Sequence, residues 1–139
     1  MKNRKYFMIQ KNIIYKNLKY LKTYESKLNP EIKYWDNGNK GYEIWYLNGK
    51  KHREDGPAYQ SWYKNGQKYY ERWYLNGKSH REDGPVSQEW HENGQKEYES
   101  WYLNDKEYSK EDWLEELKRI GSKHYGEQQM IYNTEKYNL

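Results

Sequence analysis

The sequence His-Arg-Glu-Asp-Gly-Pro, at 52–57 and again at 80–85, holds the residue types best suited to chemistry. A histidine beside two carboxylates can transfer protons or bind a metal ion, and on that hypothesis the chain is a small metal-dependent hydrolase. An element copied at equal spacing beside a turn glycine and a proline is more typical of a structural corner. There the aspartate can bond the backbone that follows it, while the arginine and the glutamate pair with neighbouring units. We therefore expect a structural role for His52, Asp55, Gly56, His80, Asp83 and Gly84.

No other group of residues indicates a catalytic site. The chain has no cysteine, which excludes disulfides, cysteine-based zinc sites and thiol nucleophiles. His91 and His124 stand alone, and the sequence has no phosphate-binding glycine loop, nucleophile elbow or His-Glu-x-x-His motif. We therefore expect a protein that is not an enzyme and that has no catalytic residue, bound metal or cofactor.

The composition predicts one small domain with an aromatic core. The chain has 139 residues, and its 25 basic and 21 acidic residues leave a net charge of +4, too small to indicate a partner. Aliphatic residues are few, but the 18 Tyr and 7 Trp can bury large areas and favour strands. The apolar runs are only a few residues long. We expect no transmembrane segment, no secretory signal and a cytoplasmic location.

A repeat of 28 residues organises the middle of the chain. Trp-Tyr-Leu-Asn-Gly-Lys at 45–50 recurs at 73–78, and again at 101–106 with Asp105 in place of the glycine. The His-Arg-Glu-Asp element recurs at the same offset. Residues 31–108 are therefore copies of one unit.

The Asn-Gly pairs in this region predict β-hairpins, because a type I′ turn needs a positive φ at both of its central residues. The pairs lie at 37–38, 48–49, 65–66, 76–77 and 93–94, and Asn104-Asp105 extends the series. The expected fold class is mainly β, an antiparallel meander of hairpins with flanking helices. Long strands are predicted at 40–47, 67–75 and 95–103, second strands at 31–36, 57–64 and 85–92, and short strands near 50–53 and 78–81.

Pairing across Asn65-Gly66 as a two-residue loop assigns the side chains to two faces, since directly opposed residues share a side. The face with the tryptophans and aliphatic residues is expected to be buried: Ala58, Gln60, Trp62, Tyr69, Glu71, Trp73 and Leu75, then Val86, Gln88, Trp90, Glu97, Glu99, Trp101 and Leu103. The other face combines tyrosine with charge and can stay wet: Tyr59, Ser61, Tyr63, Lys68, Tyr70, Arg72 and Tyr74, then Ser87, Glu89, His91, Lys96, Tyr98, Ser100 and Tyr102. We expect the four tryptophans of this face, together with Trp45, to form the structural core of the repeat.

The N-terminal segment 1–30 is basic. Residues 1–28 carry eight Lys and Arg against the single acid Glu25. The spacing of apolar residues predicts a helix over 11–28, which Pro30 would stop.

The C-terminal segment lacks a third His-Arg-Glu-Asp element. Residues 109–121 predict a helix, with Ser109 as N-cap and Gly121 just beyond its end. Because the last unit of a repeat array needs a cover, we interpret this helix as a cap. Residues 122–139 are polar, and we expect a frayed tail.

The tandem Trp-Tyr-x-Asn-Gly hairpins with an Asp-Gly-Pro turn resemble MORN-type repeats, and most closely a His-Arg-Glu-Asp-Gly-Pro variety from phage, large DNA virus and bacterial proteins. The resemblance covers 45–108 well and 31–44 loosely. It implies a mostly non-catalytic interaction or membrane-apposed module, or in some bacterial branches an antitoxin-like partner. It carries over no catalytic residue. The third unit departs from the pattern at Asp105 and in its missing His-Arg-Glu-Asp element.

Two kinds of binding fit the tyrosine-rich side. Tyrosines interleaved with Lys68, Arg72 and Lys96 can stack on bases while the cations meet phosphates. The repeat region is net acidic, however, so segment 1–28 is the better candidate for nucleic acid or an anionic membrane. An aromatic surface without a catalytic site is more typical of protein binding. We expect a protein partner, as for a phage or viral inhibitor in the host cytoplasm, bound by Tyr63, Tyr70, Arg72, Tyr74, Tyr98 and Tyr102.

Overall fold

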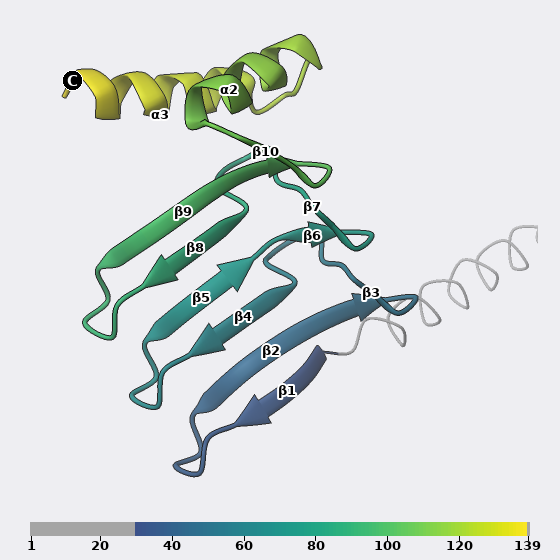
Figure 1. The fold of residues 1–139 in the computed structure, drawn as a ribbon, viewed down its shortest axis with the longest axis vertical. Coiled ribbons are helices and arrows are strands. Elements are labelled where there is room, and N and C mark those ends of the chain that lie inside the picture. Colours follow the sequence, from purple (N-terminus) through teal and green to yellow (C-terminus); the bar gives the residue numbers. More distant parts are fainter. Residues whose placement is uncertain (1–29, 139) are drawn as a thin grey trace, which may run out of the picture.

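The computed structural model describes residues 30–138, so the helix predicted over 11–28 lies outside the described residues. Within them an antiparallel sheet carries two helices at its C-terminal end (Figure 1). The elements are β1 (Pro30–Tyr34), β2 (Lys40–Leu47), β3 (Lys50–Lys51), β4 (Tyr59–Trp62), β5 (Lys68–Arg72), β6 (Tyr74–Leu75), β7 (Lys78–Ser79), β8 (Ser87–Trp90), β9 (Lys96–Leu103), β10 (Lys106–Tyr108), α2 (Lys110–Arg119) and α3 (Tyr125–Tyr137).

The strands pair in the order of the predicted meander. The sheet runs β1-β2-β4-β5-β8-β9-β10, with β3 paired to the end of β2, while β6 and β7 form a small hairpin beside it. All pairs are antiparallel. The predicted fold class, β with flanking α, is confirmed.

The Asn-Gly pairs form two different turns. In the short hairpins both central residues have a positive φ, at Asn48 and Gly49 (52° and 75°) and at Asn76 and Gly77 (51° and 82°), as the predicted type I′ turn requires. In the long hairpins only the glycine does, as at Gly66 (87°). The prediction of a two-residue type I′ loop is therefore wrong for the long hairpins.

The long hairpins close through a three-residue loop followed by a bulge. The amide of Gly66 donates to the carbonyl of Tyr63 at 3.0 Å, and the amide of Tyr63 donates to the carbonyl of Gln67 at 2.9 Å. The Asn65 side chain accepts from the amide of Gln67 at 2.9 Å, which holds the turn in this form. One extra residue therefore enters the second strand, and the register of β4 and β5 shifts between Ser61 and Trp62.

The bulge overturns part of the predicted face assignment. The predicted pairs up to Ser61 opposite Tyr70 are present, but Trp62 lies opposite Lys68. The Lys68 ammonium bonds Glu71 at 2.7 Å, on the tryptophan side of the sheet, and Lys96 bonds Glu99 in the same way at 2.9 Å. The side chains of Lys68 and Lys96 therefore lie on the tryptophan side of the sheet and not on the predicted tyrosine-rich side.

Tyr69 also lies elsewhere than predicted. Its side chain is 44% exposed, where burial was expected. Its ring lies 5.1 Å from the ring of Tyr63 and 6.5 Å from that of Tyr70, so it joins the tyrosines. The bulge frees this residue from the strict alternation of the strand.

The tryptophan face is only partly buried. Trp101 is 7% exposed, but the other repeat tryptophans are half-buried, which corrects the prediction of a full tryptophan core. A single sheet has no second layer to cover them, so long cationic side chains lie over their rings instead. The pairs are Arg53 on Trp45 (4.5 Å), Lys40 on Trp62 (5.5 Å), Arg81 on Trp73 (3.9 Å) and Lys68 on Trp90 (5.5 Å).

A ladder of alternating glutamate and glutamine crosses the tryptophan face. Successive strands place Glu43, Gln60, Glu71, Gln88 and Glu99 directly opposite one another. Glu43 and Glu71 are each 8% exposed, and each pairs with the lysine three residues before it. Because a register slip of one residue would move the whole row to the other face, this ladder favours a single register.

The predicted capping helix is confirmed as α2. The Ser109 hydroxyl accepts from the amide of Asp112 at 3.1 Å, and Gly121 has a φ of 68° beyond the end of the helix. The Trp113 ring lies 4.6 Å from the ring of Trp101, and the Lys110 ammonium lies 5.0 Å from the same ring. α2 thus takes the place that an arginine occupies in the preceding units.

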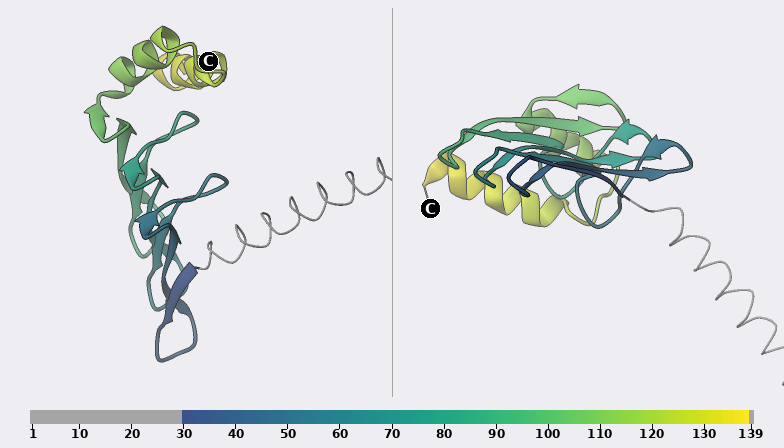
Figure 2. Two further views of the ribbon diagram at one scale, coloured as in Figure 1. Left: turned by 90° about the vertical axis from the view of Figure 1, so that its right-hand side faces the viewer. Right: turned by 90° about the horizontal axis from the view of Figure 1, so that it is seen from below.

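The predicted frayed tail is wrong, because residues 125–137 form α3. α3 packs along α2 (Figure 2), where the Tyr132 hydroxyl donates to Glu111 at 2.9 Å and Lys110 pairs with Glu135. The polar sequence of α3 has only a weak apolar stripe, so its helical structure depends on contacts with α2.

Candidate functional site

The repeated His-Arg-Glu-Asp element joins each unit to the next. Nδ1 of His52 accepts from the backbone amide of Asn76 at 2.9 Å, and Nδ1 of His80 accepts from that of Asn104 at 3.2 Å. The amide of Arg53 also donates to the carbonyl of Tyr74 at 3.1 Å. Each histidine therefore holds the tight turn that follows in the next unit. The expected contact of the glutamate with a neighbouring element is present in the second copy, where Glu82 accepts from the Ser122 hydroxyl at 2.6 Å.

The arginine side chain of the element stays within its own unit. In the second copy the Arg81 Nε donates to Asp83 at 2.7 Å, and Nη1 donates to the carbonyl of Pro85 at 3.0 Å. In the first copy the equivalent hydrogen bond from Arg53 lowers the pKa of the Asp55 carboxyl. The aspartate therefore orients the guanidinium over the tryptophan.

The glycine of this element leaves room for the guanidinium. A Cβ on Gly84 would lie 3.0 Å from Cζ of Arg81, and its φ lies outside the left-handed region. We expect Gly84→Ala to lower the free energy of unfolding by about 1–2 kcal/mol through this clash alone. Introduced together with Arg81→Ala, the same substitution should have almost no further effect. Urea unfolding of the two single variants and the double variant measures this coupling, and equal effects in both backgrounds would contradict it.

Both histidines of the element are held by backbone amides and lie beside a glutamate. Nδ1 of each accepts from a backbone amide, while Nε2 of His52 lies 3.7 Å from Glu54 and Nε2 of His80 lies 3.3 Å from Glu82. Among residues 30–138 no three histidine, aspartate or glutamate side chains lie close enough together to hold a metal ion.

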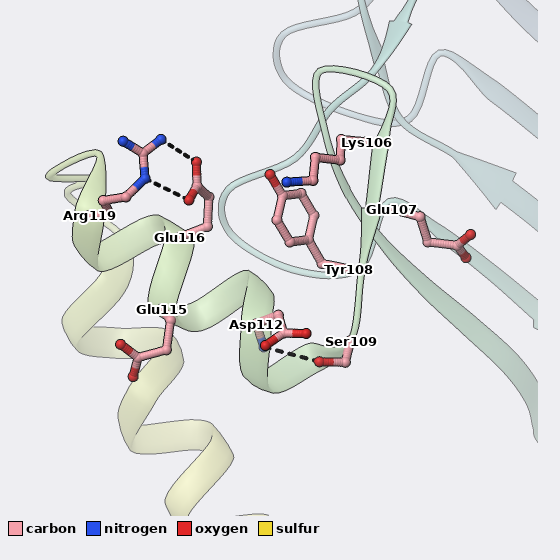
Figure 3. A pocket seen from close by; sticks show the side chains of 8 residues that line it. All are labelled: Lys106, Glu107, Tyr108, Ser109, Asp112, Glu115, Glu116 and Arg119. Atoms are coloured by element: carbon pink, nitrogen blue, oxygen red, sulfur yellow. Dashed lines mark hydrogen bonds and ion pairs between the residues drawn. The ribbon is translucent and has the colours of Figure 1, made fainter.

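An open groove of about 860 Å³ lies between β10 and α2 (Figure 3). Two of its charged side chains pair, since Arg119 donates to Glu116 at 2.7 Å and 2.5 Å, and the Ser109 hydroxyl accepts from the backbone amide of Asp112. The groove is lined by Lys106, Glu107, Tyr108, Ser109, Asp112, Glu115, Glu116 and Arg119. It places no activated nucleophile beside a base.

The face opposite the tryptophans carries a continuous chain of tyrosine rings. Ring centroids lie 5.7 Å apart between Tyr59 and Tyr70, and Tyr69 and Tyr63 extend the chain at one end. Glu89 of β8 lies opposite Tyr70 on one side and opposite Tyr98 on the other, so Tyr98 shares the face of this row; it is 49% exposed. We call this side the tyrosine face; it also contains Tyr42, Tyr46, Lys51, Arg72, Tyr74 and Tyr102.

A row of alternating cations and rings crosses the tyrosine face. The Lys51 ammonium lies 5.4 Å from the Tyr59 ring and 5.2 Å from the Tyr74 ring. The Arg72 guanidinium lies 5.6 Å from Tyr74 and 5.1 Å from Tyr102. Sequence reasoning missed Lys51, although pairing across the 48–49 turn would have placed it opposite Tyr46 on this face.

Three tyrosine hydroxyls on this face are harder to ionise than a free tyrosine. Burial raises the pKa of Tyr63, of Tyr74 and of Tyr102 above the ordinary value. The Tyr63 hydroxyl donates to the carbonyl of Trp90 at 2.9 Å, and this hydrogen bond connects one unit to the next.

A pocket of about 290 Å³ opens at the first hairpin. It is lined by Lys33, Tyr34, Trp35, Gly41, Tyr42, Tyr59, Ser61, Trp62 and Tyr69.

The structure brings together the side chains predicted to bind a partner. Tyr63, Tyr70, Arg72, Tyr74, Tyr98 and Tyr102 all belong to the tyrosine face, half-buried except for the more exposed Tyr98. α2 and α3, like the loops from β3 to β4 and from β7 to β8, lie on the other side of the sheet (Figure 2, left). No helix of the described residues covers the tyrosine face.

No protein-family model, curated protein or solved structure matches the chain. The part of the chain that the structure describes has no helix with the length and apolar character needed to cross a membrane.

Proposed function

We propose that the chain is a non-catalytic, MORN-like repeat protein that binds another protein through its tyrosine face. One observation carries this proposal: the two helices and the loops from β3 to β4 and from β7 to β8 lie on the tryptophan side of the sheet, so no described helix lies over the half-exposed tyrosine rings. Tyrosine offers a large, rigid contact area at a small entropic cost, which protein interfaces favour. An inhibitor of a host protein, as the resemblance to phage and viral repeats suggests, would act in this way.

The positions of the lysines argue against nucleic acid on this face. Lys68 and Lys96 pair with glutamates on the tryptophan face, so two of the three cations expected to contact phosphates are absent from the tyrosine face. Glu31 and Glu89 remain beside the tyrosines, where they would repel phosphates. Nucleic-acid or membrane binding would then depend on the basic segment 1–28, which lies outside the described residues.

The test compares tyrosines on two surfaces. The double variant Tyr70→Ala/Tyr74→Ala removes the centre of the tyrosine face, while Tyr137→Ala removes a 61% exposed tyrosine from α3 as a control. We expect the double variant to lose at least about tenfold in affinity for a protein captured from host lysate and then purified, and the control to bind normally. Calorimetric titration measures the affinities, and thermal unfolding checks that each variant is folded. Normal binding by the folded double variant would contradict the proposal.

A further inference from the structure

We propose that the tyrosine face binds an acidic segment of its protein partner, whose carboxylates pair with Lys51 and Arg72 on either side of Tyr74. This inference rests on the proposed function and specifies the chemistry of the partner.

Arg72 has no acidic partner, unlike the other arginines that the structure describes. Arg53 pairs with Asp55, Arg81 with Asp83 and Arg119 with Glu116. Arg72 instead donates from Nε and Nη2 to the neutral hydroxyl of Ser79, at 3.2 Å and 3.0 Å. Its positive charge is therefore held in place by a hydroxyl and two aromatic rings, and is not neutralised by any described residue.

Lys51 is also held without a carboxylate. Lys40, Lys68 and Lys96 each pair with the glutamate three residues later, but the Lys51 ammonium forms no ion pair with a described residue. The rings of Tyr59 and Tyr74 attract the cation through their π faces and leave its full charge available.

The two cations are held at fixed positions around one ring. Arg72 comes from β5 and Lys51 from β3, and they lie 5.6 Å and 5.2 Å from the centre of the Tyr74 ring. Ser79, which anchors Arg72, is 3% exposed, and its own amide donates to Asp105 at 2.7 Å. Asp105 is thereby engaged with the backbone. A pre-positioned cation loses little entropy when it pairs, which favours a carboxylate arriving from outside.

Two cations among neutral tyrosines suit a peptide segment with one or two carboxylates better than a polyanion. A nucleic acid presents a continuous row of phosphates and needs a row of cations. Here only Lys51 and Arg72 gather around Tyr74, whereas Lys33, Glu31 and Glu89 lie elsewhere on the face and Glu107 lies opposite Tyr102.

The experiment measures binding of fluorescein-labelled hexaglutamate to the full chain by anisotropy at low salt. We expect Lys51→Gln and Arg72→Gln each to weaken binding by about tenfold, as for loss of one charge-assisted hydrogen bond. Lys50→Gln is the matched control: it changes the net charge equally, on the same strand but on the opposite face, and should stay within about twofold, as for an exposed charge. Arg72→Lys keeps the charge and should retain most of the affinity. If Arg72→Gln does not fold, the comparison of Lys51→Gln with Lys50→Gln still tests the proposal.

The proposal is overturned if Lys51→Gln binds hexaglutamate no more weakly than Lys50→Gln, or if no hexaglutamate binding is detected. It is also overturned if an oligothymidylate binds more tightly than hexaglutamate and is weakened by the same variants, since the site would then recognise phosphates. The captured partner separates the two proposals. If Tyr70→Ala/Tyr74→Ala weakens partner binding while Lys51→Gln and Arg72→Gln do not, the tyrosine face is the interface but the partner segment is not acidic. If the tyrosine variant has no effect, the proposed function itself is wrong.

Discussion

Replacing Trp113 by alanine is expected to lower the free energy of unfolding by about 3–5 kcal/mol, the range for truncating a fully buried aromatic residue. Its side chain is 0% exposed, and its ring packs 4.6 Å from that of Trp101. Its indole N–H also donates to the carbonyl of Arg81 at 3.2 Å, so the substitution removes both packing and a link to the preceding unit. Urea unfolding followed by circular dichroism measures the change.

The control lies on the same chain segment. Ile120 follows α2 and is 45% exposed, so Ile120→Ala should change the free energy of unfolding by less than about 1 kcal/mol. The hydrophobic core cluster of the described residues consists of Trp101, Leu103, Trp113, Leu114 and Leu117. Similar losses for both variants would show that α2 does not supply the core of the domain.

The second large effect is expected at the tight turn of the second short hairpin. Gly77 has a φ of 82°, which a β-branched residue adopts only with strain. Gly77→Val should therefore destabilise the protein by about 2–3 kcal/mol. Its amide also donates to the carbonyl of Lys51 at 2.8 Å, so a displaced turn would disturb the neighbouring unit as well. The midpoint of thermal unfolding reports the loss.

Gly77→Asp is the matched control, because the chain itself has aspartate at the equivalent place in the third hairpin. Asp105 has a φ of 67°, and its carboxylate accepts from the amide of Ser79 at 2.7 Å. An aspartate at position 77 can make the same contact with the amide of Lys51, so we expect stability within about 1 kcal/mol of the unsubstituted protein. If valine and aspartate are equally harmful, the positive φ is not the cause.

Several features follow from the sequence because they depend on local chemistry. The type I′ turns at 48–49 and 76–77 need residues that tolerate a positive φ, and Asn-Gly supplies them. The alternation of side chains then places Tyr70, Arg72 and Tyr74 on one face without knowledge of the rest of the chain. The capping helix was equally predictable, since Ser109 and Gly121 mark its ends by their own hydrogen bonding and backbone preference.

The sequence by itself thus determined the repeat, the antiparallel meander, its cap and most of the tyrosine face. The dipeptide alone did not distinguish the Asn-Gly pairs that close through a bulge, because this form depends on the whole loop, where Asn65 accepts from the amide of Gln67. That bulge moved Lys68 to the tryptophan face and Tyr69 to the tyrosine face. Tertiary contacts also decided the folding of α3 against α2 and the degree of burial of the tryptophans. The same contacts set Lys51 and Arg72 around Tyr74, because strands β3 and β5 meet there only when neighbouring units pack.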